Sequence, residues 1–308
     1  MRCRMIFTAF CALALTGAAP AQPRRIVSLN TCADQYVLAL ADPAQIAALS
    51  PYGHDPELSA AVGRARAFRT LKRPAEEVLA IRPDLLIGFP SGGSVVGAPP
   101  GRWRTLGLAS ADSYAMILTQ IRQVAAAVGH PERGEAMIAG MNRDLAALPR
   151  PKRRGVAAYY QRRGYMTGTG TLVDDLMQRV GLINLARRLG KPALSQLSLE
   201  EMIAARPDWL IVETGSEKVV DQGTEMLHHP ILRAIPRIRV PQAWTVCGGP
   251  AYVEAARGIA AQLDGAAHKG TAQLDGAVHQ GTAQLDGAAR KGTAQRKGAA
   301  RVNAAPRH

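Results

Sequence analysis

Short apolar runs alternate with helical patterns along the first part of the chain. Runs of aliphatic and β-branched residues predict strands at residues 25–30, 46–50 and 85–88. Apolar positions at helical spacing predict helices at residues 34–40 and 76–81, and an Arg-Pro-Asp turn ends the second of them. Strands that alternate with helices are typical of a parallel α/β architecture.

The same alternation returns after a long helical stretch in the middle of the chain. Apolar positions recur at helical spacing from Tyr114 to Leu148, and Gly129-His130-Pro131 interrupts them. Because a proline ends or kinks a helix, this stretch is a connector of one helix or two. The strands predicted beyond it are 156–160, 209–212 and 244–247, and the helices are 172–180, 200–205 and 252–263.

One segment of the chain occurs twice. Residues 76–87 and 200–211 are identical at eight of twelve positions, with an offset of 124 residues. The helical connector lies between the two copies, so we predict an α/β fold of two Rossmann-like lobes, each with a mostly parallel sheet, bridged by a long α-helix. The predicted units are a signal peptide at 1–21, an N-terminal lobe at 22–112, the connecting helix at 113–150, a C-terminal lobe at 151–263 and a tail at 264–308.

The first residues of the chain predict export. Two arginines precede an apolar run at residues 5–15, which is long enough for a signal peptide and too short to span a bilayer. Residues 19–21 form an Ala-x-Ala pattern, which predicts cleavage before Gln22. Since no second long apolar stretch follows, we expect a soluble mature protein in the periplasm.

The net charge of +14 is partly carried by the two ends of the chain. Residues 1–21 carry +2 and residues 264–308 carry +4, which leaves +8 on residues 22–263. No stripe of interleaved basic and aromatic residues accompanies this charge, so we predict no nucleic-acid binding.

The tail repeats Thr-Ala-Gln-Leu-Asp-Gly with a period of 11 residues. Its units are rich in glycine and lack a continuous apolar seam, which predicts low-complexity disorder, with a structural role as the alternative.

The carboxyl ends of the predicted strands supply the candidate ligand site, since ligands of open α/β sheets bind there. If the lobes face each other, these residues line one cleft, and their aromatic, basic and hydrogen-bonding side chains suit a bulky polar or anionic ligand. We expect ligand contacts from Asn30, Thr31, Cys32, Tyr52, His54 and Phe89 of the first lobe, and from Tyr160, Arg162, Tyr165, Glu213, Cys247, Gly248 and Tyr252 of the second. Structural alternatives are a core position for Tyr159 or Tyr160, an ordinary loop role for His54 and a solvated turn at Arg162.

Two of the four cysteines, Cys32 and Cys247, lie outside the predicted signal peptide, one at a strand end of each lobe. Three alternatives stay open for this pair. The cysteines could form an inter-lobe disulfide, which can persist in an oxidising compartment. They could ligate a soft metal together with His54, which would make the protein a binder of a metal ion or a small metal chelate. They could also remain free thiols.

The sequence contains no recognisable catalytic motif. Nothing in it resembles GxSxG or HExxH, and Gly168-Thr169-Gly170 lacks the rest of a dinucleotide fingerprint. We therefore predict a protein without catalysis of its own and without a cofactor. A cysteine-dependent enzyme, with Cys32 as nucleophile and His54 as base, is the alternative from another functional class.

The start at Arg25-Ile-Val-Ser-Leu, the two repeat copies and the long middle helix together resemble the periplasmic binding proteins for cobalamin and ferric siderophores. The resemblance covers about residues 24–263. It implies two α/β lobes with limited hinge motion, and a monomer that delivers an iron complex or corrinoid to an ABC permease dimer at the inner membrane. Residues 31–34 and 247–250 depart from the family pattern at the predicted ligand site, which leaves the ligand open.

The resemblance also implies a docking surface for the permease. In the family, one acidic residue on each lobe docks onto permease arginines, and it lies at the start of the helix before each Pro-Asp turn. Carried over, these acids are Glu76 or Glu77 and Glu200 or Glu201. Ser198 and Glu201 fit a capping box, which leaves Glu200 and, by the symmetry of the repeat, Glu76 as the docking residues.

Overall fold

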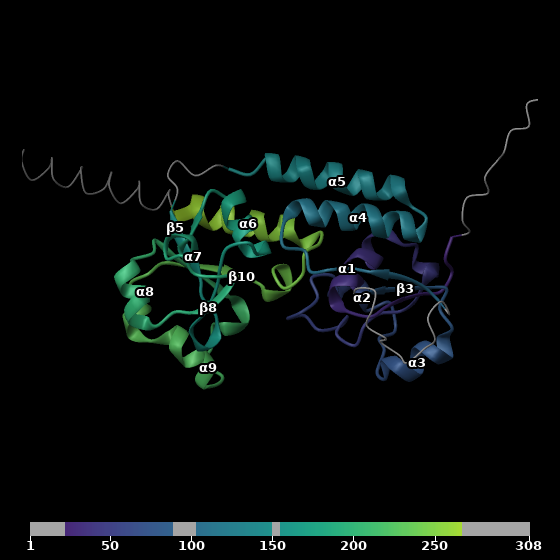
Figure 1. The fold of residues 1–308 in the computed structure, drawn as a ribbon, viewed down its shortest axis with the longest axis horizontal. Helices are drawn as coiled ribbons and strands as arrows, with labels where there is room; N and C mark the ends of the chain where they lie inside the picture. Colours follow the sequence, from purple (N-terminus) through teal and green to yellow (C-terminus); the bar gives the residue numbers. More distant parts are fainter. Residues whose placement is uncertain (1–21, 89–102, 150–154, 267–308) are drawn as a thin grey trace, which may run out of the picture.

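The computed structural model describes residues 22–88, 103–149 and 155–266, and within these ranges it contains two four-stranded parallel sheets, one in each lobe (Figure 1). The N-lobe sheet has the order β2-β1-β3-β4, and the C-lobe sheet has the order β7-β5-β9-β10. Both orders place the first and third strands of the lobe at the centre and the second and fourth at the edges, so the lobes share one topology. The strands are β1 (Ile26–Ser28), β2 (Ile46–Ala48), β3 (Leu85–Gly88), β4 (Arg104–Gly107), β5 (Val156–Tyr159), β7 (Ile183–Asn184), β9 (Trp209–Glu213) and β10 (Arg237–Val240).

Helices cover the sheets and connect the strands. The α-helices are α1 (Thr31–Leu40), α2 (Val62–Ala65), α3 (Pro74–Ile81), α4 (Tyr114–Val128), α5 (Pro131–Ala146), α6 (Leu172–Arg179), α7 (Leu185–Arg188), α8 (Leu199–Ala205) and α9 (Gln222–Glu225). Short 3-10 helices are η1 (Pro43–Gln45), η2 (Arg162–Gly164), η3 (Thr214–Ser216), η4 (Met226–His228), η5 (Pro230–Leu232) and η6 (Gln242–Trp244). A last helix occupies residues 251–266, so it extends beyond residue 263, the predicted end of the C-terminal lobe. The predicted signal peptide and nearly all of the predicted tail lie outside the described residues.

The two copies of the sequence repeat adopt the same conformation. Each copy forms a helix, a turn and a central strand: α3 and β3 in the N lobe, α8 and β9 in the C lobe. Arg82 and Arg206 end the two helices in the left-handed conformation, with φ of 51° and 46°. Asp84 then accepts hydrogen bonds from the backbone just before β1, and Asp208 accepts one from the first residue of β5. The Pro-Asp turn therefore ties each repeat to the first strand of its own sheet.

The connector is a pair of antiparallel helices, which is the two-helix alternative that the Gly129-His130-Pro131 break left open. Gly129 ends α4 with φ of 89°, and Pro131 begins α5, where its missing N–H costs no helical hydrogen bond. The antiparallel pairing brings the Tyr114 hydroxyl to Asn142 Oδ1 at 2.9 Å. Both helices lie along the same side of the molecule over the N lobe (Figure 1), and the start of α4 meets the C lobe, where the Tyr114 N–H is directed to Asp175.

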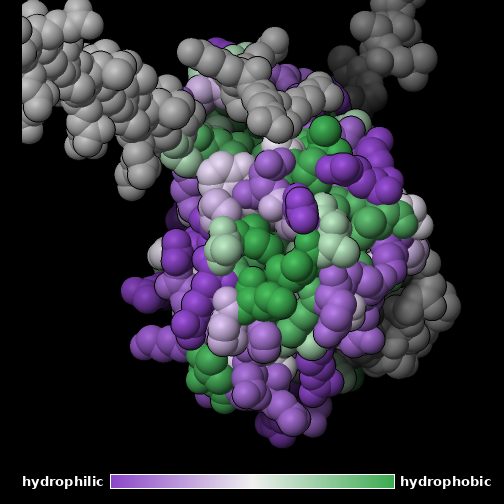
Figure 2. Space-filling view, turned by 90° about the vertical axis from the view of Figure 1, so that its left-hand side faces the viewer, coloured by the Kyte–Doolittle hydropathy of each residue, from purple (hydrophilic) through white to green (hydrophobic). Residues whose placement is uncertain are grey.

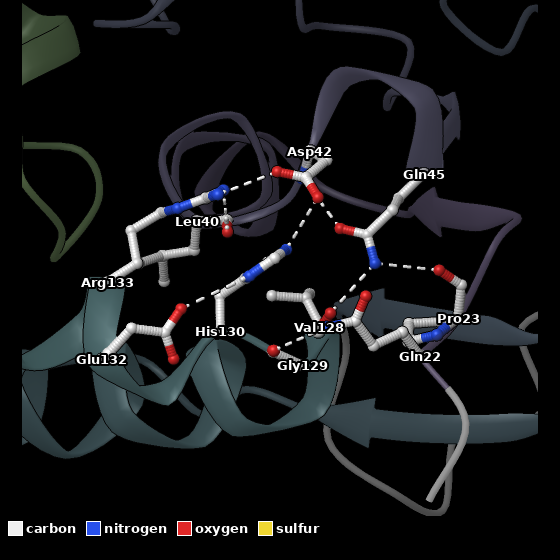
Figure 3. A network of polar contacts seen from close by, with 10 residues as sticks. All are labelled: Gln22, Pro23, Leu40, Asp42, Gln45, Val128, Gly129, His130, Glu132 and Arg133. Carbon is white, nitrogen blue, oxygen red and sulfur yellow. Dashed lines mark hydrogen bonds and ion pairs between the residues drawn. The ribbon is translucent and has the colours of Figure 1, made fainter.

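Polar contacts fix the turn between α4 and α5 onto the N lobe (Figure 3). Asp42 accepts a hydrogen bond from Arg133 at 2.8 Å, and its second oxygen lies 2.9 Å from His130 Nε2. The side chain of Gln45 donates to the backbone carbonyl of Val128 at 2.9 Å. Arg133 and then His130 hold the pKa of Asp42 below its ordinary value. The turn is thus attached through several independent hydrogen bonds.

Several regions of sheet differ from the sequence prediction, which did not include β4, β7 or β10. Residues 244–247 do not form a strand; the chain there makes η6 and a turn, and the edge strand is β10 instead. In β10 two buried residues, Ile238 and Val240, alternate with arginines, and prolines stand on both sides, so its apolar signal is short. A two-stranded antiparallel ribbon of β6 (Tyr165–Thr167) and β8 (Leu194–Gln196) was also not predicted.

The outer end of the C lobe carries an apolar area. Figure 2 looks at this end and shows apolar side chains gathered in one region with polar side chains around it. Exposed large apolar residues of the C lobe include Leu189, Leu194, Val219, Val220 and Ile231. This end lies away from the N lobe, so the area is outside the space between the lobes (Figure 1).

Candidate functional site

The carboxyl ends of the two sheets face each other. The evidence is that the segments following the strands of one sheet contact the segments following the strands of the other. Cys32, just after β1, and Cys247, after β10, form a disulfide with a Cα–Cα distance of 5.2 Å. The Tyr36 hydroxyl of α1 donates to the carbonyl of the residue after Cys247 at 2.8 Å. Gly215, after β9, packs against Glu57 of the N lobe, since a Cβ placed there would lie 2.7 Å from Glu57 Oε2. This is the position where ligands bind in α/β proteins.

The disulfide decides between the alternatives for the cysteines. Its sulfurs are bonded to each other, so they neither ligate a metal nor act as nucleophiles, and both alternative functions built on Cys32 are wrong for this structure. His54 is also engaged: its Nε2 lies 2.9 Å from the carbonyl of Ala65 and 3.0 Å from that of Phe68. Across the described ranges, no three His, Cys, Asp or Glu side chains are grouped so that they could hold a metal ion.

Several predicted ligand contacts are core residues instead. Tyr160 is fully buried and donates to the carbonyl of Leu197, and Tyr252 is 1% exposed. Gly248 is buried against the N lobe. Both faces of each parallel sheet are covered, so Tyr159 and Tyr160 are both buried although they point to opposite faces. The predicted contacts from Tyr160, Tyr252 and Gly248 are therefore corrected to packing roles.

Among the described residues of the N lobe, Tyr52 is a large exposed side chain at this edge. Its exposed fraction is 57%, which is high for an aromatic residue. Asn30 instead accepts a hydrogen bond from the Ala33 N–H at 2.8 Å and caps α1, while Thr31 is the first residue of that helix and is half-buried. The predicted contact at Phe89 lies outside the described residues.

Asp34 anchors the turn that carries Tyr52. This carboxyl is fully buried and accepts hydrogen bonds from the Ser50 backbone at 3.0 Å and from the Ser50 hydroxyl at 2.6 Å. Burial raises the pKa of Asp34, and the hydrogen bonds to Ser28 and Ser50 oppose that shift. The sequence indicates this role only through the place of Asp34 in the first turn of α1. The turn is thus held against the helix that bears the inter-lobe disulfide.

In the C lobe, the ribbon and η2 place polar side chains at the edge of the sheet. Arg162 is exposed and pairs with Asp221. Tyr165 is 38% exposed and shares one side of its strand with Thr167, because side chains alternate along a strand. The Thr167 hydroxyl donates to Gln161 at 3.1 Å, so Tyr165 stands on the side of the ribbon that faces this edge.

A hydrogen-bonded network surrounds Glu213 at the end of β9. Glu213 Oε1 accepts hydrogen bonds from the Tyr159 hydroxyl at 3.1 Å and from Gln161 Nε2 at 3.0 Å. The Tyr159 hydroxyl also lies 2.9 Å from Thr245 Oγ1. Burial, and then the nearby charge of Glu213, raise the pKa of Tyr159 far above its ordinary value, so its hydroxyl stays neutral. Sequence reasoning predicted Glu213 at this edge but not the hydrogen bonds around it. Tyr159 is the last residue of β5, Gln161 follows that strand, and Thr245 follows β10.

Comparison with known families identifies the fold. The family described as "Periplasmic binding protein" matches residues 26–239, well over half of the chain. The chain belongs to this family. Its members are solute-binding proteins that work outside the cytoplasm. A search of curated proteins finds no match. In the described ranges, no helix has both the length and the apolar character needed to cross a bilayer.

Solved structures of the family share this architecture. The periplasmic heme-binding protein RhuT from Roseiflexus sp. RS-1 is 25% identical, over 78% of this chain and 97% of that one, with a TM-score of 0.60. The periplasmic heme-binding protein HutB of Vibrio cholerae is 21% identical, over 78% and 98%, with a TM-score of 0.61. The periplasmic vitamin B12 binding protein BtuF of Vibrio cholerae is 14% identical, over 79% and 97%, with a TM-score of 0.55. These matches confirm the predicted fold class of two α/β lobes.

Proposed function

We propose that this protein is the periplasmic solute-binding subunit of an ABC importer. It captures a metal chelate between its lobes as a monomer and delivers it to the permease dimer, after a signal peptide at residues 1–21 has directed its export. The observation that carries the proposal is the opposition of the two carboxyl edges, with the exposed Tyr52 on one edge and the exposed Tyr165 and half-buried Glu213 on the other. Aromatic faces and a few fixed polar groups suit a large chelate.

The ligand class rests on the relatives. RhuT and HutB bind heme, and BtuF binds vitamin B12, according to their descriptions. A ferric hydroxamate system of Saccharomonospora viridis is also similar in structure. We therefore propose an iron complex or a corrinoid as the ligand. Equilibrium titration with heme, cobalamin and a ferric hydroxamate, followed by tryptophan fluorescence, tests this; binding of none of the three contradicts the proposal.

Replacing Tyr52 by alanine should weaken binding of the preferred chelate about tenfold or more. The side chain is exposed in the free protein, so its apolar surface can be buried only by the ligand, and such burial is worth about 1.5–3 kcal/mol. The dissociation constant measures the effect. Leu79→Ala is the control, because Leu79 is a similarly exposed apolar residue on α3. Unchanged affinity in Tyr52→Ala would remove Tyr52 from the site.

For the permease, we propose that Glu76 and Glu200 are the docking residues. Within each repeat the second glutamate is engaged: Glu77 accepts from two backbone N–H groups before α3, and Glu201 completes a capping box with Ser198. Glu76 is exposed and makes a single ion pair with Arg73. Glu200 is exposed and makes no side-chain hydrogen bond or ion pair with any described residue. One accessible carboxylate per lobe remains for a partner.

The double variant Glu76→Arg, Glu200→Arg should leave ligand affinity unchanged and lower the ligand-stimulated ATPase activity of the reconstituted importer at least tenfold. At two docking points the variant replaces a carboxylate that attracts a permease arginine by an arginine that repels it. This repulsion slows association and weakens the complex. Glu225→Arg, at an exposed position on α9, is the control. Full stimulation by the double variant would show that docking uses other residues.

A further inference from the structure

The carboxylate of Glu213 is held in one orientation by neutral partners. Two donors, Tyr159 and Gln161, bind the same oxygen, Oε1. Each donor is fixed in turn, Tyr159 by Thr245 and Gln161 by Thr167. The residues of this network come from β5 and the segment after it, β6, β9 and the segment after β10, all at the carboxyl edge of the C-lobe sheet. The carboxylate is therefore preorganised before any ligand arrives.

The other oxygen of Glu213 has no partner among the residues that the structure describes. Oε2 accepts no hydrogen bond from any described residue, and within the described ranges Glu213 has no ion-pair partner. It is also not among the buried polar atoms that lack a partner, so solvent reaches it. Arg162, a cation of the segment after β5, is already paired with Asp221. A half-buried carboxylate with an open oxygen and no counter-charge attracts a hydrogen-bond donor of a ligand and repels a ligand anion.

We propose that Glu213 determines ligand specificity by accepting a hydrogen bond from an N–H group on the periphery of the chelate. This inference rests on the proposed function, and it deepens it by naming the ligand class. Heme presents two carboxylates on its edge, which Glu213 repels. The corrin ring of a complete corrinoid carries primary amides instead. Their N–H groups can donate hydrogen bonds to Glu213. Among the chelates named above, the structure thus favours an amidated corrinoid.

Two forms of one ring give the sharpest test. Dicyanocobinamide carries amides where dicyanocobyrinic acid carries carboxylates, so shape and metal are nearly constant. The full exported protein should bind the amide form about ten- to a hundredfold more tightly, the range expected for a hydrogen bond to a charged group. Glu213→Gln should reduce this ratio about tenfold, by weakening the amide form and strengthening the carboxylate form. Glu135→Gln, on the α4–α5 connector, should keep the ratio of the unmodified protein.

The outcomes separate the two proposals. If the unmodified protein binds heme more tightly than either corrinoid, or if Glu213→Gln keeps the full discrimination, the role of Glu213 is overturned while the solute-binding function stands. If heme, corrinoids and ferric hydroxamate all fail to bind, the proposed function itself fails. A uniform loss of affinity for both ring forms in Glu213→Gln would indicate a structural role and would also overturn the specificity proposal.

Discussion

Replacing Cys32 and Cys247 together by serine is expected to lower the free energy of unfolding by about 5 kcal/mol. The disulfide joins residues 215 apart in the sequence, so it closes a loop that contains most of both lobes. In the chain-entropy description, a loop of that size restricts the unfolded chain by about 5 kcal/mol at 25 °C. The loss would be a large fraction of the total stability of a typical protein of this kind.

Urea unfolding followed by tryptophan fluorescence measures this loss. The matched control is chemical reduction: a reductant should destabilise the unmodified protein by the same amount and should leave the double serine variant unaffected. A difference below about 1 kcal/mol would mean that the native lobes keep their arrangement without the bond and that the unfolded chain gains little freedom from its removal. Such a result would contradict the prediction.

The sequence predicted the architecture well where one pattern repeats. The copies at 76–87 and 200–211 required two equivalent units, and both form the same helix, turn and central strand. Cys32 and Cys247 were both predicted at strand ends on facing edges; the two residues do meet there, although the strand predicted at 244–247 is absent and Cys247 follows β10 instead. The sequence could not choose between a disulfide, a metal site and free thiols, because that choice depends on a distance between lobes that no local pattern encodes.

The individual contacts of the site were harder to predict, for physical reasons. In a strand with one solvated face, alternation would have placed either Tyr159 or Tyr160 in the cleft. Here both faces of the sheet are covered, so Tyr159 and Tyr160 point to opposite faces and both are buried, each in a different part of the core. For His54 the sequence left a ligand contact and an ordinary loop role open, and its loop folds so that Nε2 lies within hydrogen-bond distance of two backbone carbonyls. Tertiary packing decides such cases.

The core between the lobes depends strongly on Tyr252, which the sequence placed in the ligand site. Its ring lies 5.1 Å from the ring of Tyr114 at the start of the connector, and its hydroxyl donates to Asp175 of α6. The backbone N–H of Tyr114 is also directed to Asp175, at 3.3 Å. One side chain therefore links the last described helix, the connector and the C lobe.

Tyr252→Ala is expected to lower the free energy of unfolding by about 3–5 kcal/mol, since it removes a buried ring and leaves a cavity. Tyr252→Phe, which removes only the hydroxyl bonded to Asp175, should cost about 1.5–3 kcal/mol, the range for a hydrogen bond to a charged group. Tyr165→Ala is the control, because an exposed tyrosine should contribute within about 0.5 kcal/mol. Urea unfolding measures the free energy of unfolding of the three variants and so ranks their losses. If Tyr252→Ala were as stable as Tyr165→Ala, the inter-lobe core would not depend on this ring, and the arrangement of the cleft would rest on the disulfide and on Tyr36 instead.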